Sequence, residues 1–207
     1  MNYFVKLGLV LLIITAIASG ILAFINSITE PIIIENQKRA QVEARKDVLS
    51  KATTFVADSV NVEKKATVNN PLKKITKSAG NKFYYFVGTD NDKNIVGYTF
   101  VASQYGYSSE IKTMVGVNSD FTLNKIKIIY QSETPGLGAN CENDDFAPKF
   151  FQKTENELKV DKDGGKIASL TGATITTRAI TNSIREGLEN LEKAISDKKV
   201  AKTEEGK

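Results

Sequence analysis

An uncharged apolar segment near the N-terminus constrains this chain more than any other feature of its sequence. Residues 7–25, LGLVLLIITAIASGILAFI, contain no charged side chain, and Thr15 and Ser19 are their only polar residues. As an α-helix, about 20 residues rising about 1.5 Å each span the roughly 30 Å of a bilayer's hydrocarbon core. The segment therefore predicts a single membrane anchor, within residues 1–27, that contacts the lipid bilayer.

A cleaved secretion signal is the alternative explanation of this segment. Ala16, Ile17 and Ala18 resemble a small-residue cleavage site. The apolar run continues to Ile25, past the usual end of such a signal, which favours a retained anchor. More Lys and Arg follow the segment than precede it, which favours a cytoplasmic domain, but long domains translocate largely regardless of charge. Charge alone therefore leaves the orientation open.

The composition limits the chemistry that the 207-residue chain performs with its own side chains. It has no histidine, the commonest general base and metal ligand. Cys141 is the only cysteine, which excludes an intramolecular disulfide and a four-cysteine metal site. The net charge of +4 is mild and its lysines are interspersed with acidic residues, so nucleic acid is not an expected partner. A redox role requires an organic cofactor or a partner's metal.

Beyond the anchor, the sequence predicts an α+β fold, with one antiparallel sheet and helices on one side of it. Residues 28–80 predict a stalk helix beginning near Pro31 and a lysine-rich connecting region with a turn at residues 69–71. Residues 197–207 form a polar tail that is expected to be disordered. The domain itself, residues 81–196, contains four runs that predict strands: KFYYFVG, NIVGYTFVAS, IKTMVGV and LNKIKIIYQS.

A final amphipathic helix is predicted over residues 176–196, where apolar residues recur every three or four positions. Such an apolar face packs on a sheet. A short helix is expected at residues 144–151, and a turn at residues 162–165. The apolar positions of the final helix are Ile180, Ile184, Leu188, Leu191 and Ile195.

Residues 169–184, SLTGATITTRAITNSI, place many hydroxyl groups around the start of this helix, with no His, Cys or carboxylate among them. Thr174 then lies near a helix N-terminus, where free backbone N–H groups and the helix dipole favour a phosphate. Gly172 and Ala173 allow such a group to approach closely. Plain N-capping by threonine, worth about 1 kcal/mol, is the alternative. No P-loop pattern is present, which argues against a nucleoside triphosphatase.

Two segments together resemble the signatures of a family of membrane-anchored FMN-binding domains. They are TGAT at residues 171–174 and ETPGLG at residues 133–138. The family includes the G subunit of the Rnf ion-translocating electron-transport complex and the C subunit of the sodium-pumping NADH:quinone reductase. By itself, Pro-Gly followed by Gly indicates only a tight loop. Both motifs in this order behind one apolar span are far more specific, and the resemblance covers essentially the whole chain.

The resemblance implies covalently bound FMN, attached to Thr174 through a phosphoester bond by a separate flavin transferase. Residues 81–196 are then the FMN-binding domain. The ETPGLG loop is expected to lie against the flavin, with Leu137 on the ring and Glu133 at its polar edge. No metal site and no catalytic residue are expected. The implied cofactor-binding residues are Thr174, Thr171, Gly172, Ala173, Glu133, Thr134, Leu137 and Gly138.

The chain departs from the family pattern in the segments around these motifs. The family commonly has an acidic residue three positions before the first motif hydroxyl, where this chain has Ala168, although Asp163 is nearby. A glycine-rich turn is reduced to YGYSS, in which Tyr105 and Tyr107 are candidates to stack on a flavin or are ordinary core or surface residues. Cys141 is interpreted as an unpaired small residue without a redox role.

On this resemblance, the chain is expected to relay electrons as the G subunit of an Rnf-type complex. That complex couples ferredoxin and NAD oxidoreduction to ion translocation, so other membrane subunits are expected partners. The FMN domain is expected on the extracytoplasmic face, and stand-alone catalysis is not expected. The alternatives are the C subunit of the sodium-pumping reductase, an anchored FMN module of another extracytoplasmic reductase, and a structural subunit in which Thr174 only caps a helix.

Overall fold

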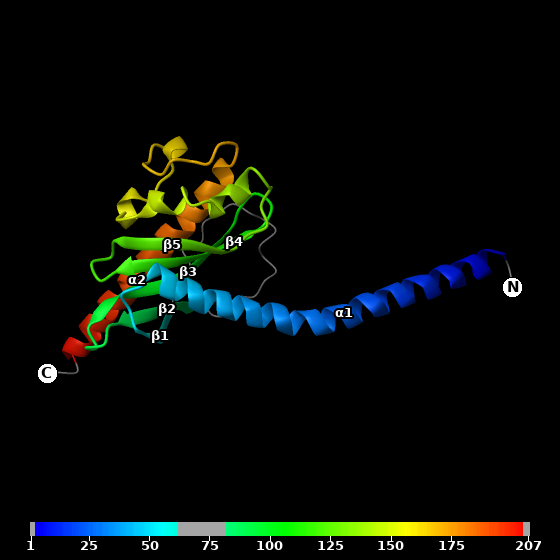
Figure 1. Cartoon of the computed structure of the whole chain (residues 1–207), viewed down its shortest axis with the longest axis horizontal. Helices are drawn as coiled ribbons and strands as arrows, with labels where there is room; N and C mark the ends of the chain where they lie inside the picture. The colour runs from blue at the N-terminus through cyan, green and yellow to red at the C-terminus, as the bar shows by residue number, and fades with distance from the viewer. Residues whose placement is uncertain (1–2, 62–81, 205–207) are drawn as a thin grey trace. The chain divides into compact units, whose positions relative to one another are not determined.

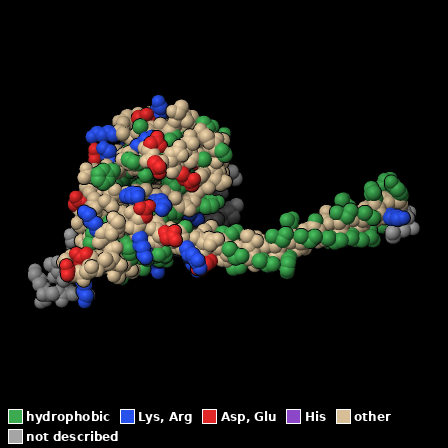
Figure 2. Space-filling model, in the orientation of Figure 1, with side chains coloured by type: hydrophobic (Ala, Val, Ile, Leu, Met, Phe, Trp, Pro, Cys, Tyr) green, Lys and Arg blue, Asp and Glu red, His purple; other side chains and the backbone are tan. Residues whose placement is uncertain are grey.

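The computed structural model describes residues 3–61 and 82–204, and the chain divides into two compact units between Val42 and Glu43. Helix α1 (Tyr3–Val48) provides the first unit and continues into the second (Figure 1). Helix α1 is long and apolar enough to cross a membrane, and hydrophobic side chains cover its N-terminal part (Figure 2). The predicted anchor therefore is a single exposed apolar helix.

The predicted start of a separate stalk helix at Pro31 is wrong, because α1 runs through this residue without interruption. A proline inside a helix removes one backbone donor and crowds the preceding turn. In this chain the helix nevertheless continues on both sides of Pro31. The anchor and the stalk are thus one continuous element.

Within the described residues, five strands form one antiparallel sheet in the order β1-β2-β3-β4-β5. The four predicted strands are present. The edge strand β1 was not predicted, and it lies in the stretch expected to be a connecting region. No side chain of this strand is fully buried, so it lacks a strong apolar pattern. The turn expected at residues 69–71 lies outside the described residues. The strands are β1 (Thr54–Asn61), β2 (Lys82–Thr89), β3 (Ile95–Tyr105), β4 (Glu110–Asn118) and β5 (Leu123–Tyr130).

Helix α2 (Thr174–Glu204) packs across one face of this sheet and buries the predicted apolar face. Gly187 allows the close approach, since a Cβ there would lie 2.2 Å from the Phe100 ring. The helix does not end at residue 196 but continues to Glu204, so most of the expected disordered tail is helical. Lys198 in this extension pairs with Asp58 of β1.

The expectation of helices on one side of the sheet is also wrong, because the last turns of α1 cover the opposite face. Ala44 and Val48 are buried there against Met114 of β4. Asn124 Nδ2 donates to the Val48 carbonyl at 2.7 Å, and a Cβ at Gly116 would lie 2.2 Å from the same oxygen. The sheet is therefore enclosed between α2 and the C-terminal end of α1.

The chain between β5 and α2 contains short 3-10 helices instead of the single helix expected at residues 144–151. Phe146 and Phe150 are fully buried, so this stretch packs on the core with few residues. The predicted turn at 162–165 overlaps the end of the last of them, and Gly164 adopts a φ of +83° there. The 3-10 helices are η2 (Gly138–Glu142), η3 (Ala147–Phe150), η4 (Glu155–Glu157) and η5 (Asp161–Asp163).

Candidate functional site

Hydrogen bonds engage most of the hydroxyl groups in the TGAT region. Ser169 Oγ donates to Asp161 Oδ1 at 2.5 Å, just before the motif. Thr176 Oγ1, in the first turn of α2, donates to Glu133 Oε2 at 2.6 Å. These two bonds attach the motif to η5 on one side and to the ETPGLG loop on the other.

Thr177, rather than Thr174, makes the side-chain hydrogen bonds that cap the start of α2. Its Oγ1 donates to the Ala173 carbonyl at 3.1 Å and accepts the Leu170 N–H at 3.0 Å. Further along the helix, the hydroxyls of Thr181 and Ser183 donate to backbone carbonyls one turn earlier. These hydroxyl groups stabilise the helix and its entry, and all of them have protein partners.

The hydroxyls of Thr171 and Thr174 are the ones in this stretch that make no hydrogen bond to residues 3–61 or 82–204. Thr171 is exposed, and Thr174 is half-buried as the first residue of α2. The backbone N–H groups of a first helical turn have no acceptor within the helix. Thr174 therefore combines a free hydroxyl with a helix N-terminus, and its side chain does not serve as a cap.

Glu133 joins the two motif segments through a buried carboxylate that is only 6% exposed. Its Oε2 accepts the Thr176 hydroxyl at 2.6 Å and the Tyr107 N–H at 3.2 Å. Its Oε1 accepts the N–H groups of Ser108 and Ser109, both at 3.0 Å. The sequence placed Glu133 at a flavin edge, whereas in the structure both of its oxygens are engaged by the protein.

These hydrogen bonds keep the Glu133 carboxylate ionised. Burial by itself raises the pKa of a carboxyl group, because it disfavours the charged form. The hydrogen bonds from Thr176 and from the backbone of residues 107–109 outweigh that effect and lower the pKa of Glu133 from 4.5 to about 2. The carboxylate is thus a fixed negative charge that holds the β3–β4 turn, the loop after β5 and the start of α2 together.

Leu137 brings the ETPGLG loop against the TGAT motif. Its Cδ2 lies 2.9 Å from the position that a Cβ would take at Gly172, and the φ of Gly172 is +73°. The positive φ favours glycine at this position, and a side chain there would displace the end of the Leu137 side chain. Gly138 is buried, and a Cβ there would lie 2.7 Å from Glu133 Oε2 and from Thr176 Oγ1. Leu137 itself remains 43% exposed beside the motif.

The remaining loop residues have structural positions. Thr134 is exposed, and its carbonyl accepts the N–H groups of Leu137 and Ala139, which closes the loop. Cys141 is buried, and burial, with smaller contributions from the Glu142 and Glu133 charges, raises the pKa of its thiol to about 12. A protonated, buried thiol is a poor nucleophile. The structure therefore agrees with the interpretation of Cys141 as an unreactive small residue.

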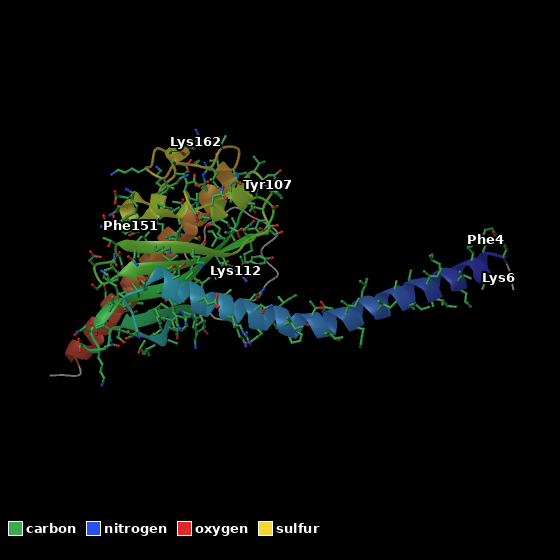
Figure 3. All side chains as sticks on the ribbon, in the orientation of Figure 1. Phe4, Lys6, Tyr107, Lys112, Phe151 and Lys162 are labelled. Carbon is green, nitrogen blue, oxygen red and sulfur yellow. The ribbon has the colours of Figure 1, made fainter. Side chains whose placement is uncertain are left out.

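The two tyrosines of the β3–β4 turn differ in their surroundings. Tyr105 donates its hydroxyl to the Ser108 carbonyl at 2.7 Å, so its side chain lies along its own turn. Tyr107 is 68% exposed and projects at the edge of the domain (Figure 3). Its backbone N–H is held by Glu133, as described above. Of the two, Tyr107 has the freer side chain for a ligand.

Acidic residues of η5 lie beside the motif, although Ala168 is not acidic. Asp161 Oδ1 accepts both the hydroxyl and the N–H of Ser169, the latter at 3.2 Å. Asp163 accepts two hydrogen bonds from Arg178 of α2, both at 2.7 Å. The η5 turn is thus attached to the chain before the TGAT motif and to the helical turn after it.

These positions fit a flavin mononucleotide whose phosphate is attached at Thr174. The Thr174 hydroxyl is free, Gly172 has no side chain that would block approach, and the first-turn N–H groups favour an anionic phosphate. Leu137 and Ile175 expose apolar surface next to the motif, 43% and 51% exposed, which suits the faces of an aromatic ring. Within the described residues there is no cluster of His, Cys, Asp and Glu that would hold a metal.

Comparison with known proteins supports an FMN-binding domain in this chain. A profile of the FMN-binding domain family matches residues 106–189, which include both motif segments and the β3–β4 turn. A profile of the RnfG N-terminal region matches residues 3–48, the whole of α1 in its described extent. The structure and these matches define a protein with an FMN-binding domain behind an apolar N-terminal helix.

Individual relatives narrow this class to one family. The G subunit of the Na(+)-translocating ferredoxin:NAD(+) oxidoreductase complex of Acetobacterium woodii is 33% identical over 89% of this chain and 89% of its own length. The G subunit of the ion-translocating oxidoreductase complex of Methanosarcina acetivorans is 28% identical over 89% of this chain and 92% of its own. The chain therefore belongs to the family of G subunits of ion-translocating oxidoreductase complexes.

A solved structure shows the same fold. The crystal structure of Shewanella oneidensis NqrC aligns with a TM-score of 0.54 and 19% sequence identity, over 76% of this chain and 99% of that chain. At this identity the likeness concerns the fold alone. It confirms the α+β architecture of an antiparallel sheet with a C-terminal helix.

Proposed function

We propose that this chain is the covalent-FMN subunit of an Rnf-type complex, in which it relays electrons between partner subunits. The complex would couple ferredoxin and NAD oxidoreduction to ion translocation, and α1 would anchor the subunit in the lipid bilayer. Membership of the G-subunit family and the match of the FMN-binding domain support this proposal. A bound flavin supplies the electron transfer that the side chains of this chain lack.

The observation that carries the proposal is the free hydroxyl of Thr174. The neighbouring hydroxyls of Ser169, Thr176 and Thr177 have protein partners, whereas that of Thr174 has none within the described residues. A hydroxyl that neither caps the helix nor packs in the core suits an attachment point. The chain needs no general base beside it, because a separate flavin transferase would perform the attachment.

The intact mass of the membrane-extracted chain tests this proposal. Bond formation between Thr174 Oγ1 and the flavin phosphorus breaks one P–O bond, and the departing oxygen group leaves with the threonine hydroxyl hydrogen. Relative to free FMN, the atoms lost add up to one water. The mass is therefore expected to exceed that of the sequence by one FMN less one water. A chain produced without a flavin transferase is expected to fold and to be colourless. An unchanged mass for the chain taken from its native membrane would reject the proposal.

Leu137 is expected to shield the flavin ring from water. In a Leu137→Ala protein, water reaches the ring and stabilises the more charged reduced forms, so the reduction potential rises. We expect a change on the order of 30 mV, equivalent to about 1.4 kcal/mol for two electrons. A redox titration followed by flavin absorbance measures it, with Leu137→Met as the volume-conserving control. Full attachment with an unchanged potential and unchanged flavin fluorescence would remove Leu137 from the site.

The FMN domain is proposed to lie outside the cytoplasm. Asp92 is exposed in the turn between β2 and β3, so a cysteine introduced there reports which side of the membrane the domain occupies. Asp92→Cys, in a Cys141→Ser background, is expected to react with a membrane-impermeant thiol reagent in intact cells. The wild-type chain serves as a control, because buried Cys141 should remain unlabelled until the protein unfolds. Labelling of Asp92→Cys only after lysis would place the domain inside.

A further inference from the structure

Arg178 has a position that the attachment of a flavin alone does not explain. It lies four residues after Thr174 in α2, and residues four apart are neighbours on one helix face. Side chains of a helix tilt toward its N-terminus, so the Arg178 side chain extends in the direction of Thr174. Arg178 thus places a positive charge on the helix face that carries the free hydroxyl.

Asp163 holds one edge of the Arg178 guanidinium and leaves the other edge free. Nε and Nη2 donate to Oδ2 and Oδ1 of Asp163, both at 2.7 Å. This fork uses two of the five N–H donors of an arginine. The Nη1 side makes no further hydrogen bond to the described residues. The arginine is therefore fixed in place and still has donors available.

The η5 turn holds the Arg178 side chain in one orientation. Asp161, two residues before Asp163 in η5, binds Ser169 just before the TGAT motif. The same short turn therefore fixes both the chain that enters the motif and the arginine that follows it. Lys162, between the two aspartates, is exposed at the outer edge of the domain (Figure 3).

We infer that Arg178 binds the phosphate group at Thr174 with the free edge of its guanidinium, while Asp163 holds the opposite edge. The inference rests on the proposed attachment of flavin and assigns the partner of its phosphate. A phosphodiester carries one negative charge shared by its two unesterified oxygens. An arginine edge can donate to both oxygens, whereas a lysine ammonium binds as a point charge. In this arrangement Arg178 positions the flavin and takes no part in its electron transfer.

A comparison of flavin-carrying and flavin-free chains tests the inference. The full chain, solubilised in detergent, is produced with and without a flavin transferase, as the wild type and as Arg178→Gln. The exposed Arg185 of the same helix offers a matched control, Arg185→Gln, with the same charge change farther along the helix. The measurements are the thermal midpoint of both forms and the phosphorus resonance of the attached flavin.

Arg178→Gln is expected to lower the midpoint of the flavin-carrying chain by about 3 °C more than that of the flavin-free chain. Arg178→Gln should also shift the phosphorus resonance of the attached flavin. Arg185→Gln should lower the thermal midpoints of the flavin-carrying and flavin-free chains equally, if at all, and should leave the phosphorus resonance unchanged. If Arg178→Gln removed only the ion pair with Asp163, the thermal midpoints of the flavin-carrying and flavin-free chains would fall equally. Equal lowering with an unshifted resonance would therefore overturn the inference.

Two other outcomes are distinguishable. A wild-type chain without the mass of a flavin would reject the proposed function and the inference with it. If Arg178→Gln folds but is not flavinylated, Arg178→Lys decides the question. Attachment restored by lysine supports a cationic contact to the phosphate. Attachment that stays absent with lysine, in a chain with the wild-type thermal midpoint, counts against it.

Discussion

Thr174→Ala is expected to abolish covalent flavin completely while leaving the fold intact. The phosphoester requires the hydroxyl oxygen, which alanine lacks. The hydroxyl makes no hydrogen bond to the described residues, so its loss should change the free energy of unfolding by no more than about 0.5 kcal/mol. The denatured protein should be colourless, and its intact mass should equal that of the substituted sequence.

Two matched variants make this result specific. Thr171→Ala removes the other free hydroxyl of the motif and should leave the flavin attached. Thr174→Ser keeps a hydroxyl at the same position and should retain at least part of the attachment. If Thr171→Ala lost the flavin while Thr174→Ala kept it, the assignment of the attachment point would be wrong.

The parts of the fold that the sequence predicts are those with strong local patterns. The apolar segment at residues 7–25, the four strands from β2 to β5 and the apolar face of α2 each repeat their pattern over many residues. Strand β1 lacks such a pattern, because it lies at the edge of the sheet and none of its side chains is fully buried. Val48 of α1 packs against Met114 on the face of the sheet opposite α2. This tertiary contact leaves no local pattern in the sequence.

In the candidate site, the sequence identified the motif residues, but it did not predict the hydrogen bonds and contacts between them. Thr174 and Leu137 followed from a resemblance, and the structure places Leu137 against Gly172 of the same motif. The same resemblance assigned Glu133 to the polar edge of the flavin. Its actual partners include Thr176, 43 positions away, and such a long-range hydrogen bond leaves no periodic signal in the sequence.

Because Glu133 joins the start of α2 to the β3–β4 turn, we expect Glu133→Gln to lower the free energy of unfolding strongly. Glutamine has nearly the same shape, but its NH2 group must face hydroxyl and N–H donors that now bond to the carboxylate. Burying unpaired donors costs about 1–3 kcal/mol per group, so we expect a loss of at least about 3 kcal/mol at pH 7. The thermal midpoint should fall by about 10 °C. Glu142→Gln, an exposed carboxylate nearby, should have little effect.

The pH dependence of stability distinguishes the charge of Glu133 from its shape. Its pKa in the folded protein, about 2, lies below its ordinary value of 4.5, so the folded state favours the ionised form. This contribution, about 3 kcal/mol, is fully present above pH 4.5 and is lost as the pH falls toward 2. Unfolding of the wild type and of Glu133→Gln, followed by urea titration at several pH values, should therefore converge in acid. A difference between the two that stays constant from pH 7 to pH 2.5 would show that Glu133 acts by shape alone, and its hydrogen bonds to Thr176 and to the β3–β4 turn would not depend on ionisation.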